Sequence, residues 1–74
     1  MKTVETGTIE IVVNGEPRRV PQGLDVVGLL EFLAIDASRV AVELNRAIVH
    51  KTDWPATMID VGARLEIVWF VGGG

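Results

Sequence analysis

The sequence ends on three glycines, Gly72, Gly73 and Gly74, and this end is the part of the chain best suited to covalent chemistry. A terminal α-carboxylate has a pKa of about 3.3 to 3.7, so it is ionised at neutral pH and can act as an oxygen nucleophile. Residues without a Cβ atom can pass through a narrow groove where a side-chain branch would clash. We therefore expect Gly74 to carry the reactive carboxylate, and Gly72 and Gly73 to give it reach.

Terminal glycines are by themselves typical of frayed chain ends and linkers. Here they follow directly, without a spacer, on the apolar segment of residues 64–71. We therefore divide the chain into a folded domain, residues 1–71, and a flexible tail, residues 72–74. A single domain of 74 residues buries only about 60% of its unfolded surface, which leaves little core for a deep catalytic pocket. The sequence thus favours a carrier on which other enzymes act, and not an enzyme.

The chain contains no cysteine and one histidine, which restricts the chemistry of its side chains. A disulfide, a thiolate metal site and a thiol nucleophile all require cysteine. His50 and Asp53 lie close together in the sequence, but two such residues make a poor ligand set for a metal. We expect no metal site and no bound cofactor.

The formal net charge is −3, and Arg18-Arg19 is the one basic pair in the sequence. This charge offers no electrostatic footprint for a nucleic-acid backbone. No apolar run approaches the roughly 20 residues that span a bilayer, and residues 1–5 lack the apolar core of a signal peptide. We expect a cytoplasmic protein that binds neither nucleic acid nor membrane and is monomeric when free.

Hydrophobic periodicity predicts a hairpin followed by a helix. Apolar residues alternate along residues 8–13, Asn14-Gly15 can form a tight type I′ turn, and residues 16–20 then return as a second strand. Asp25 can cap a helix of about 10 residues. Its buried stripe comprises Val26, Leu29, Leu30 and Leu33.

The second half of the chain reads as three further strands. These cover residues 39–44, 47–49 and 64–71, with a turn at Asn45-Arg46, a helical turn at residues 53–55 and another turn at residues 60–63. The fold class is therefore α+β, with one main helix packed across a mixed sheet of four to five strands. We expect the last strand to lie centrally, beside the first.

Alternation along the last strand separates two faces. Leu65, Ile67 and Trp69 share one face, whereas Val68 and Phe70 share the other. If the helix covers the first set, the second set lies exposed beside the tail and offers a docking surface for partner proteins. The alternative is that loops cover both faces. The predicted partner-binding residues are Val68, Phe70, Val71 and, by its outward parity on the first strand, Val12.

The order of these elements and the glycine tail resemble the β-grasp fold of ubiquitin-like proteins, and more closely the ThiS-type sulfur carriers of thiamine biosynthesis. Beyond the tail, the likeness rests on residues 12–16, residues 40–45, Ile48-Val49 followed by Trp54, and residues 65–68. Three turns depart from the family pattern. Asn45-Arg46 stands where an Asn-Gly turn is common, residues 60–63 replace an Asp-Gly-Asp turn, and His50-Lys51 replaces a Pro-Arg pair.

The resemblance implies a mechanism that depends on partner enzymes. A ThiF-like, ubiquitin-activating-type enzyme would use ATP to join the Gly74 carboxylate to AMP. A cysteine-derived sulfur donor system would then convert the acyl-adenylate to a thiocarboxylate, which delivers sulfur to a ThiG-like thiazole synthase. Three alternatives use the same fold: a MoaD-type carrier for molybdopterin synthesis, a ubiquitin-like protein modifier, and an interaction domain with an idle tail.

Overall fold

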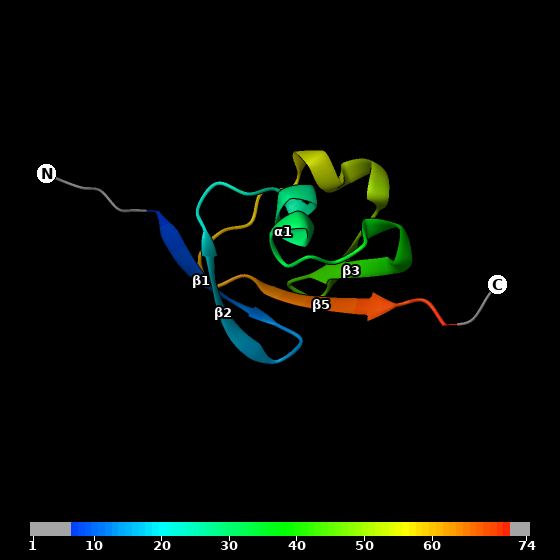
Figure 1. Ribbon diagram of the computed structural model, residues 1–74, viewed down its shortest axis with the longest axis horizontal. Helices are drawn as coiled ribbons and strands as arrows, with labels where there is room; N and C mark the ends of the chain where they lie inside the picture. The colour runs from blue at the N-terminus through cyan, green and yellow to red at the C-terminus, as the bar shows by residue number, and fades with distance from the viewer. Residues whose placement is uncertain (1–6, 72–74) are drawn as a thin grey trace, which may run out of the picture.

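Five strands form one mixed sheet, and a single α-helix lies across one face of it in the computed structural model (Figure 1), which describes residues 7–71. The strands lie in the order β2-β1-β5-β3-β4. Their bounds are β1 Thr8–Val13, β2 Glu16–Pro21, β3 Val40–Leu44, β4 Ala47–Val49 and β5 Arg64–Trp69; the helix is α1 Val26–Phe32, with two 3₁₀ helices, η1 Ala37–Arg39 and η2 Lys51–Ala56. The predicted α+β layout is confirmed. The last strand is central, parallel to β1 and antiparallel to β3.

The hairpin between β1 and β2 has the predicted two-residue turn. Asn14 and Gly15 have φ angles of 51° and 82°, and Val13 pairs with Glu16 across the turn. Positive φ at both central residues is the requirement of a type I′ turn, whose twist matches that of the two strands. The second strand extends one residue beyond the prediction, to Pro21, at the outer edge of the sheet.

Asp25 begins the helix, as predicted. Its side chain accepts a hydrogen bond of 2.7 Å from the Gly28 backbone N–H, one of the donors that the first helical turn leaves without a partner. A Cβ atom at Gly28 would lie 3.2 Å from Leu24 Cδ2 and 3.4 Å from Asp25 Oδ1. The absence of a side chain at this position therefore lets the capping residues pack closely on the first turn.

Substitution of Asp25 by alanine is expected to destabilise the domain by about 1 kcal/mol, because the capping acceptor is lost. Urea denaturation of the variant measures this change in the free energy of unfolding. Asp25→Asn keeps a capping oxygen and serves as the control. Equal destabilisation by both substitutions would contradict a capping role.

The helix is shorter than predicted, with seven residues and not about ten. Ala34 adopts a left-handed φ of 61°, its N–H donates to the Glu31 carbonyl, and the Ile35 N–H donates to the Leu30 carbonyl. These two bonds form a Schellman motif, which satisfies the last helical carbonyls and ends the helix. Glycine is the usual residue at the left-handed position, so the alanine here gave no signal of a helix end in the sequence.

The core lies between α1 and the inner face of the sheet. The stripe residues Val26, Leu29 and Leu30 are fully buried there, while Leu33 is partly buried at the helix end. Trp54 of η2 is also buried, and its Nε1 donates a 2.9 Å hydrogen bond to the Val49 carbonyl. Within residues 7–71, no helix lies on the opposite, outer face of the sheet (Figure 1).

Candidate functional site

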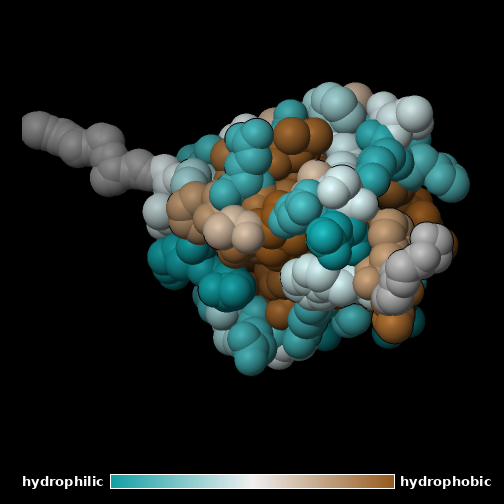
Figure 2. Space-filling view, turned by 45° about the vertical axis from the view of Figure 1, so that its right-hand side comes forward, coloured by the Kyte–Doolittle hydropathy of each residue, from teal (hydrophilic) through white to brown (hydrophobic). Residues whose placement is uncertain are grey.

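The last residues before the tail are exposed. Leu65 and Ile67 are buried against the helix, whereas Val68 is 56%, Phe70 61% and Val71 93% exposed. Figure 2 shows hydrophobic residues that reach the surface between hydrophilic side chains. Gly72, Gly73 and Gly74 lie outside the described residues. The described chain thus leads toward them along a strand whose final side chains are apolar and open to contact.

Two neighbouring strands enlarge the apolar surface around Val68 and Phe70. Ala41 of β3 lies directly opposite Val68, and Ile48 of β4 is 66% exposed on the same face. We name these four residues, Ala41, Ile48, Val68 and Phe70, the tail-side patch. A shallow groove of about 330 Å³ adjoins it, lined by Val40, Ala41, Ile48, Val49, His50, Lys51, Trp54 and Phe70. Ala41 and Ile48 were not predicted, because the pairing of β3 with β5 cannot be derived from local periodicity.

Val12 lies on the same outer face but not within the tail-side patch. It is partly buried and pairs with Arg64 at the start of β5, four residues before Val68. Four residues of strand span about 13 Å. The structure therefore brings Val68 and Phe70 together with β3 and β4, and leaves Val12 at the opposite end of β5.

Trp69 faces the same side of the sheet as Leu65 and Ile67 but is not buried with them. It is 47% exposed and pairs with Val40, the first residue of β3. The end of β5 extends past α1 (Figure 1), so the helix does not cover this position. The last strand was predicted to continue to Val71. It ends at Trp69, because its neighbour β3 begins at Val40, the residue that pairs with Trp69.

The side chain of Asn14 forms two hydrogen bonds with the backbone in the middle of β5. Its Oδ1 accepts a 2.7 Å hydrogen bond from the Ile67 N–H, and its Nδ2 donates a 3.2 Å hydrogen bond to the Ile67 carbonyl. The paired residues of β1 and β5 are only Val12 with Arg64 and Val13 with Leu65. The amide of Asn14 therefore continues the pairing of β5 toward the tail after β1 has turned away.

Asn45 acts in a similar way at the start of β5. Its N–H donates to the Arg64 carbonyl at 2.8 Å, and its Oδ1 accepts from the Arg64 N–H at 3.0 Å. Asn14 and Asn45 were predicted from the sequence to form turns, with no contact to β5. An asparagine in a turn with positive φ could have suggested these hydrogen bonds to the backbone, since its side-chain amide can mimic a peptide group.

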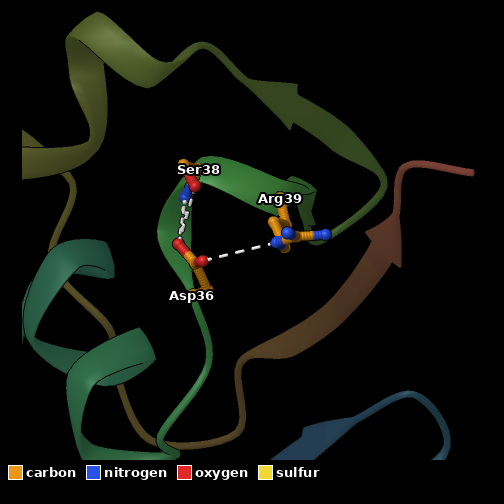
Figure 3. Close-up of polar contacts among 3 residues, drawn as sticks. All are labelled: Asp36, Ser38 and Arg39. Atoms are coloured by element: carbon orange, nitrogen blue, oxygen red, sulfur yellow. Dashed lines mark hydrogen bonds and ion pairs between the residues drawn. The ribbon is translucent and has the colours of Figure 1, made fainter. Parts of the chain in front are cut away.

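A capped 3₁₀ helix anchors the backbone just before the tail. Asp36 Oδ1 accepts hydrogen bonds from the Ser38 hydroxyl at 2.7 Å and the Ser38 N–H at 3.0 Å, and Asp36 Oδ2 lies 3.5 Å from Arg39 Nε (Figure 3). The Arg39 carbonyl in turn accepts a 2.9 Å hydrogen bond from the Phe70 N–H. Arg39 was predicted to begin the third strand. It belongs to this helix instead, because Asp36 caps a turn that ends at Arg39.

Acid is expected to loosen this anchor. The Ser38 hydroxyl and N–H, and then Arg39 and Lys51, hold the pKa of Asp36 below its ordinary value of 3.8. A carboxylate with a lowered pKa contributes stability that is present above pH 3.8 and lost as the pH falls through its folded-state pKa. NMR titration should show the Ser38 and Phe70 amide shifts changing together below pH 3.8. In Asp36→Asn this linked change should be absent; its persistence would contradict the assignment to Asp36.

Within residues 7–71, no group of three or more His, Cys, Asp and Glu residues is placed to hold a metal ion. His50 and Asp53 are both exposed near η2. No helix in the part of the chain that the structure describes is long and apolar enough to cross a membrane.

Comparison with solved structures places this geometry in a known fold. A crystal structure of the thiamine biosynthesis protein ThiS from Geobacter metallireducens superposes with a TM-score of 0.80 at 35% sequence identity, and the match covers 89% of this chain and 100% of that one. An NMR structure of a thiamine biosynthesis protein from the same organism gives a TM-score of 0.75 at 33% identity, with coverage of 89% and 88%. The sheet with one main helix is therefore the β-grasp fold.

Sequence comparison reaches the glycine tail as well as the folded domain. A thiazole synthase of Paramagnetospirillum magneticum is 41% identical over 66 residues, which are 89% of this chain and 20% of that protein. The chain thus spans about a fifth of the thiazole synthases that it matches. The uncharacterized protein ycf40 of Pyropia yezoensis is 36% identical, with 89% of this chain and 93% of that protein covered. The sequence model of the ThiS family matches residues 11–74, and the chain belongs to this family.

Proposed function

We propose that this protein is a sulfur carrier for thiazole formation in thiamine biosynthesis, and that it acts as a co-substrate of partner enzymes. The observation that carries the proposal is the match to the ThiS family over residues 11–74, which includes both the β-grasp domain and the glycine tail. The exposed side chains of Val68, Phe70 and Val71 support it. They give partner enzymes an apolar surface to hold beside the reactive end.

Activation begins at the Gly74 carboxylate in this proposal. A carboxylate oxygen attacks the α-phosphate of ATP in a ThiF-like enzyme, and pyrophosphate leaves as the acyl-adenylate forms. Sulfide-level sulfur, a hydrosulfide equivalent derived from cysteine by a donor system, then attacks the acyl carbon, AMP leaves, and the thioacid loses its proton. The product is a thiocarboxylate at Gly74. ATP is bound by the activating partner, and the carrier supplies the acyl group and the docking surface.

The acceptor of the sulfur is a ThiG-like thiazole synthase. The similarity to two proteins named thiazole synthase supports this partner, because each contains a stretch like this chain within a polypeptide about five times longer. A carrier-like stretch in the same polypeptide is kept at high effective concentration near the remainder of the synthase. Where carrier and synthase are not joined, the folded surface of the carrier must provide the affinity instead.

Intact-mass spectrometry tests the proposal. The protein is incubated with a ThiF-like enzyme, ATP and a sulfur donor, and a mass increase equal to the exchange of one oxygen for one sulfur is expected, dependent on ATP. Adducts to lysine would indicate a protein modifier, and transfer of sulfur to a molybdopterin synthase large subunit, with none to thiazole synthase, would indicate a MoaD-type carrier. An unchanged mass in a system that modifies a known ThiS protein would refute activation.

A further inference from the structure

We propose that the groove beside the tail-side patch binds the chain's own glycine tail, and that the Gly74 carboxylate pairs there with the ammonium group of Lys51. The free carrier thus holds its reactive end on the folded domain until a partner enzyme displaces it. The inference rests on the proposed function in taking Gly74 as the reactive residue. It deepens that function, because it assigns a resting position to the tail and a regulatory role to Lys51.

The tail leaves the folded domain at the rim of this groove. Phe70 lines the groove together with Lys51 and Trp54. The Phe70 N–H donates a 2.9 Å hydrogen bond to the Arg39 carbonyl, which fixes the backbone one residue before Val71. The three glycines after Val71 span at most about 10 to 11 Å. Because Phe70 and Lys51 line the same groove, this length is sufficient to bring the terminal carboxylate from one to the other.

Lys51 supplies the positive charge that a terminal carboxylate attracts. Its Nζ lies 5.6 Å from the centroid of the Trp54 ring, a distance at which the ring attracts a cation and holds it in place. Trp54 is itself buried and fixed by the hydrogen bond from its Nε1 to the Val49 carbonyl. Within residues 7–71, Lys51 forms no ion pair closer than 4.0 Å, whereas Arg39 is paired with Asp36. A carboxylate that enters the groove therefore meets a positioned and unpaired ammonium group.

Attachment to the domain favours the tail over other occupants of the groove. An ion pair at an exposed lysine is weak and does not hold a separate molecule. The tail is joined to the groove through Val71 alone, so its effective concentration there is on the order of millimolar or higher. Glycine has no Cβ atom, so the backbone can reverse its direction after Val71 and lie in a shallow groove with its peptide groups still open to water.

NMR spectra of the free carrier test the contact without any partner enzyme. A chain with an amidated C-terminus has the same length but no carboxylate. In the wild type, we expect amidation to shift the signals of the Trp54 indole N–H and the Ile48 amide, both of which belong to the groove. In Lys51→Gln we expect this shift to be lost. Arg18→Gln, on the exposed edge strand β2, is the control and should retain it.

Salt provides a second measurement on the same samples. At an ionic strength of about 1 M the Debye length falls to about 3 Å, so the shift caused by amidation should become smaller in the wild type. Absence of a shift on amidation, or a shift that persists in Lys51→Gln, overturns the inference. A shift that grows with protein concentration indicates that a second copy binds the tail, and overturns it as well.

Activation assays test the regulatory consequence and separate it from the proposed function. With the ThiF-like enzyme below saturation, Lys51→Gln should be adenylated up to about 5-fold faster than the wild type, because its tail is no longer held. A rate equal to or below that of the wild type overturns the regulatory role. A carrier whose tail binds the groove in the NMR test but which never gains a thiocarboxylate refutes the proposed function and leaves the contact established.

Discussion

Removal of Gly74 is expected to abolish thiocarboxylate formation and to leave the fold intact. The shortened chain still ends in a carboxylate, but that group lies one residue, about 3.5 Å, short of its position in the activating enzyme. A misplacement of about 1 Å can already reduce a rate 100-fold, so a loss of at least ~100-fold is expected. Intact mass after incubation with the activating enzyme measures the product, and circular dichroism checks the fold.

A matched variant separates the length of the tail from its composition. Gly72→Ala keeps the number of residues and the terminal glycine but adds a Cβ atom, so we expect slower activation and not its complete loss. If the chain without Gly74 still accepts sulfur at the wild-type rate, the reactive group is not the Gly74 carboxylate. The melting temperatures of both variants should equal that of the wild type, since the core residues lie within the domain.

Asn14→Ala is expected to lower the free energy of unfolding by about 2 to 5 kcal/mol. Two hydrogen bonds to Ile67 disappear, at about 0.5 to 1.5 kcal/mol each. Alanine must also adopt the left-handed φ of 51°, which costs an L-residue about 1 to 2 kcal/mol. Urea denaturation measures the free energy of unfolding. Hydrogen exchange at the Ile67 amide should become faster, because its acceptor is lost.

Two further substitutions at this position divide the effect into its parts. Asn14→Gly permits the left-handed turn but lacks the side chain, so it should be less destabilising than alanine while exchange at Ile67 remains fast. Asn14→Asp keeps an acceptor for the Ile67 N–H and loses the donor to the Ile67 carbonyl. Wild-type exchange at Ile67 in Asn14→Gly would contradict the role of the amide.

Local sequence signals predicted most of the elements correctly. They did so where a single residue or a hydrophobic repeat determines the backbone conformation. Asn14-Gly15 specifies a turn with positive φ, and Asp25 supplies a capping acceptor. The predictions failed at element ends, for physical reasons. Ala34 ends α1 in a conformation usually taken by glycine, and Asp36 draws Arg39 into η1. The end of β5 depends on how far its neighbour β3 extends.

The candidate site shows the same division. Alternation along β5 was sufficient to separate Val68 and Phe70 from the buried Leu65 and Ile67, because side chains on a strand point alternately to opposite faces. It could not reveal which residues lie beside them on other strands. Ala41 and Ile48 join this surface through pairing across the chain, and Val12 is placed at the far end of β5 by the parallel register with β1.

The sequence by itself determined the order of the elements, the outward direction of Val68 and Phe70, and the likeness to the ThiS family, because these depend on local periodicity and on residue type. Tertiary structure alone decided the pairing of Ala41 with Val68, the hydrogen bonds between Asn14 and Ile67, and the hydrogen bond from Phe70 to Arg39. These contacts join residues between 27 and 53 positions apart. Strand register sets such distances, and a single sequence contains no local signal for register between distant strands.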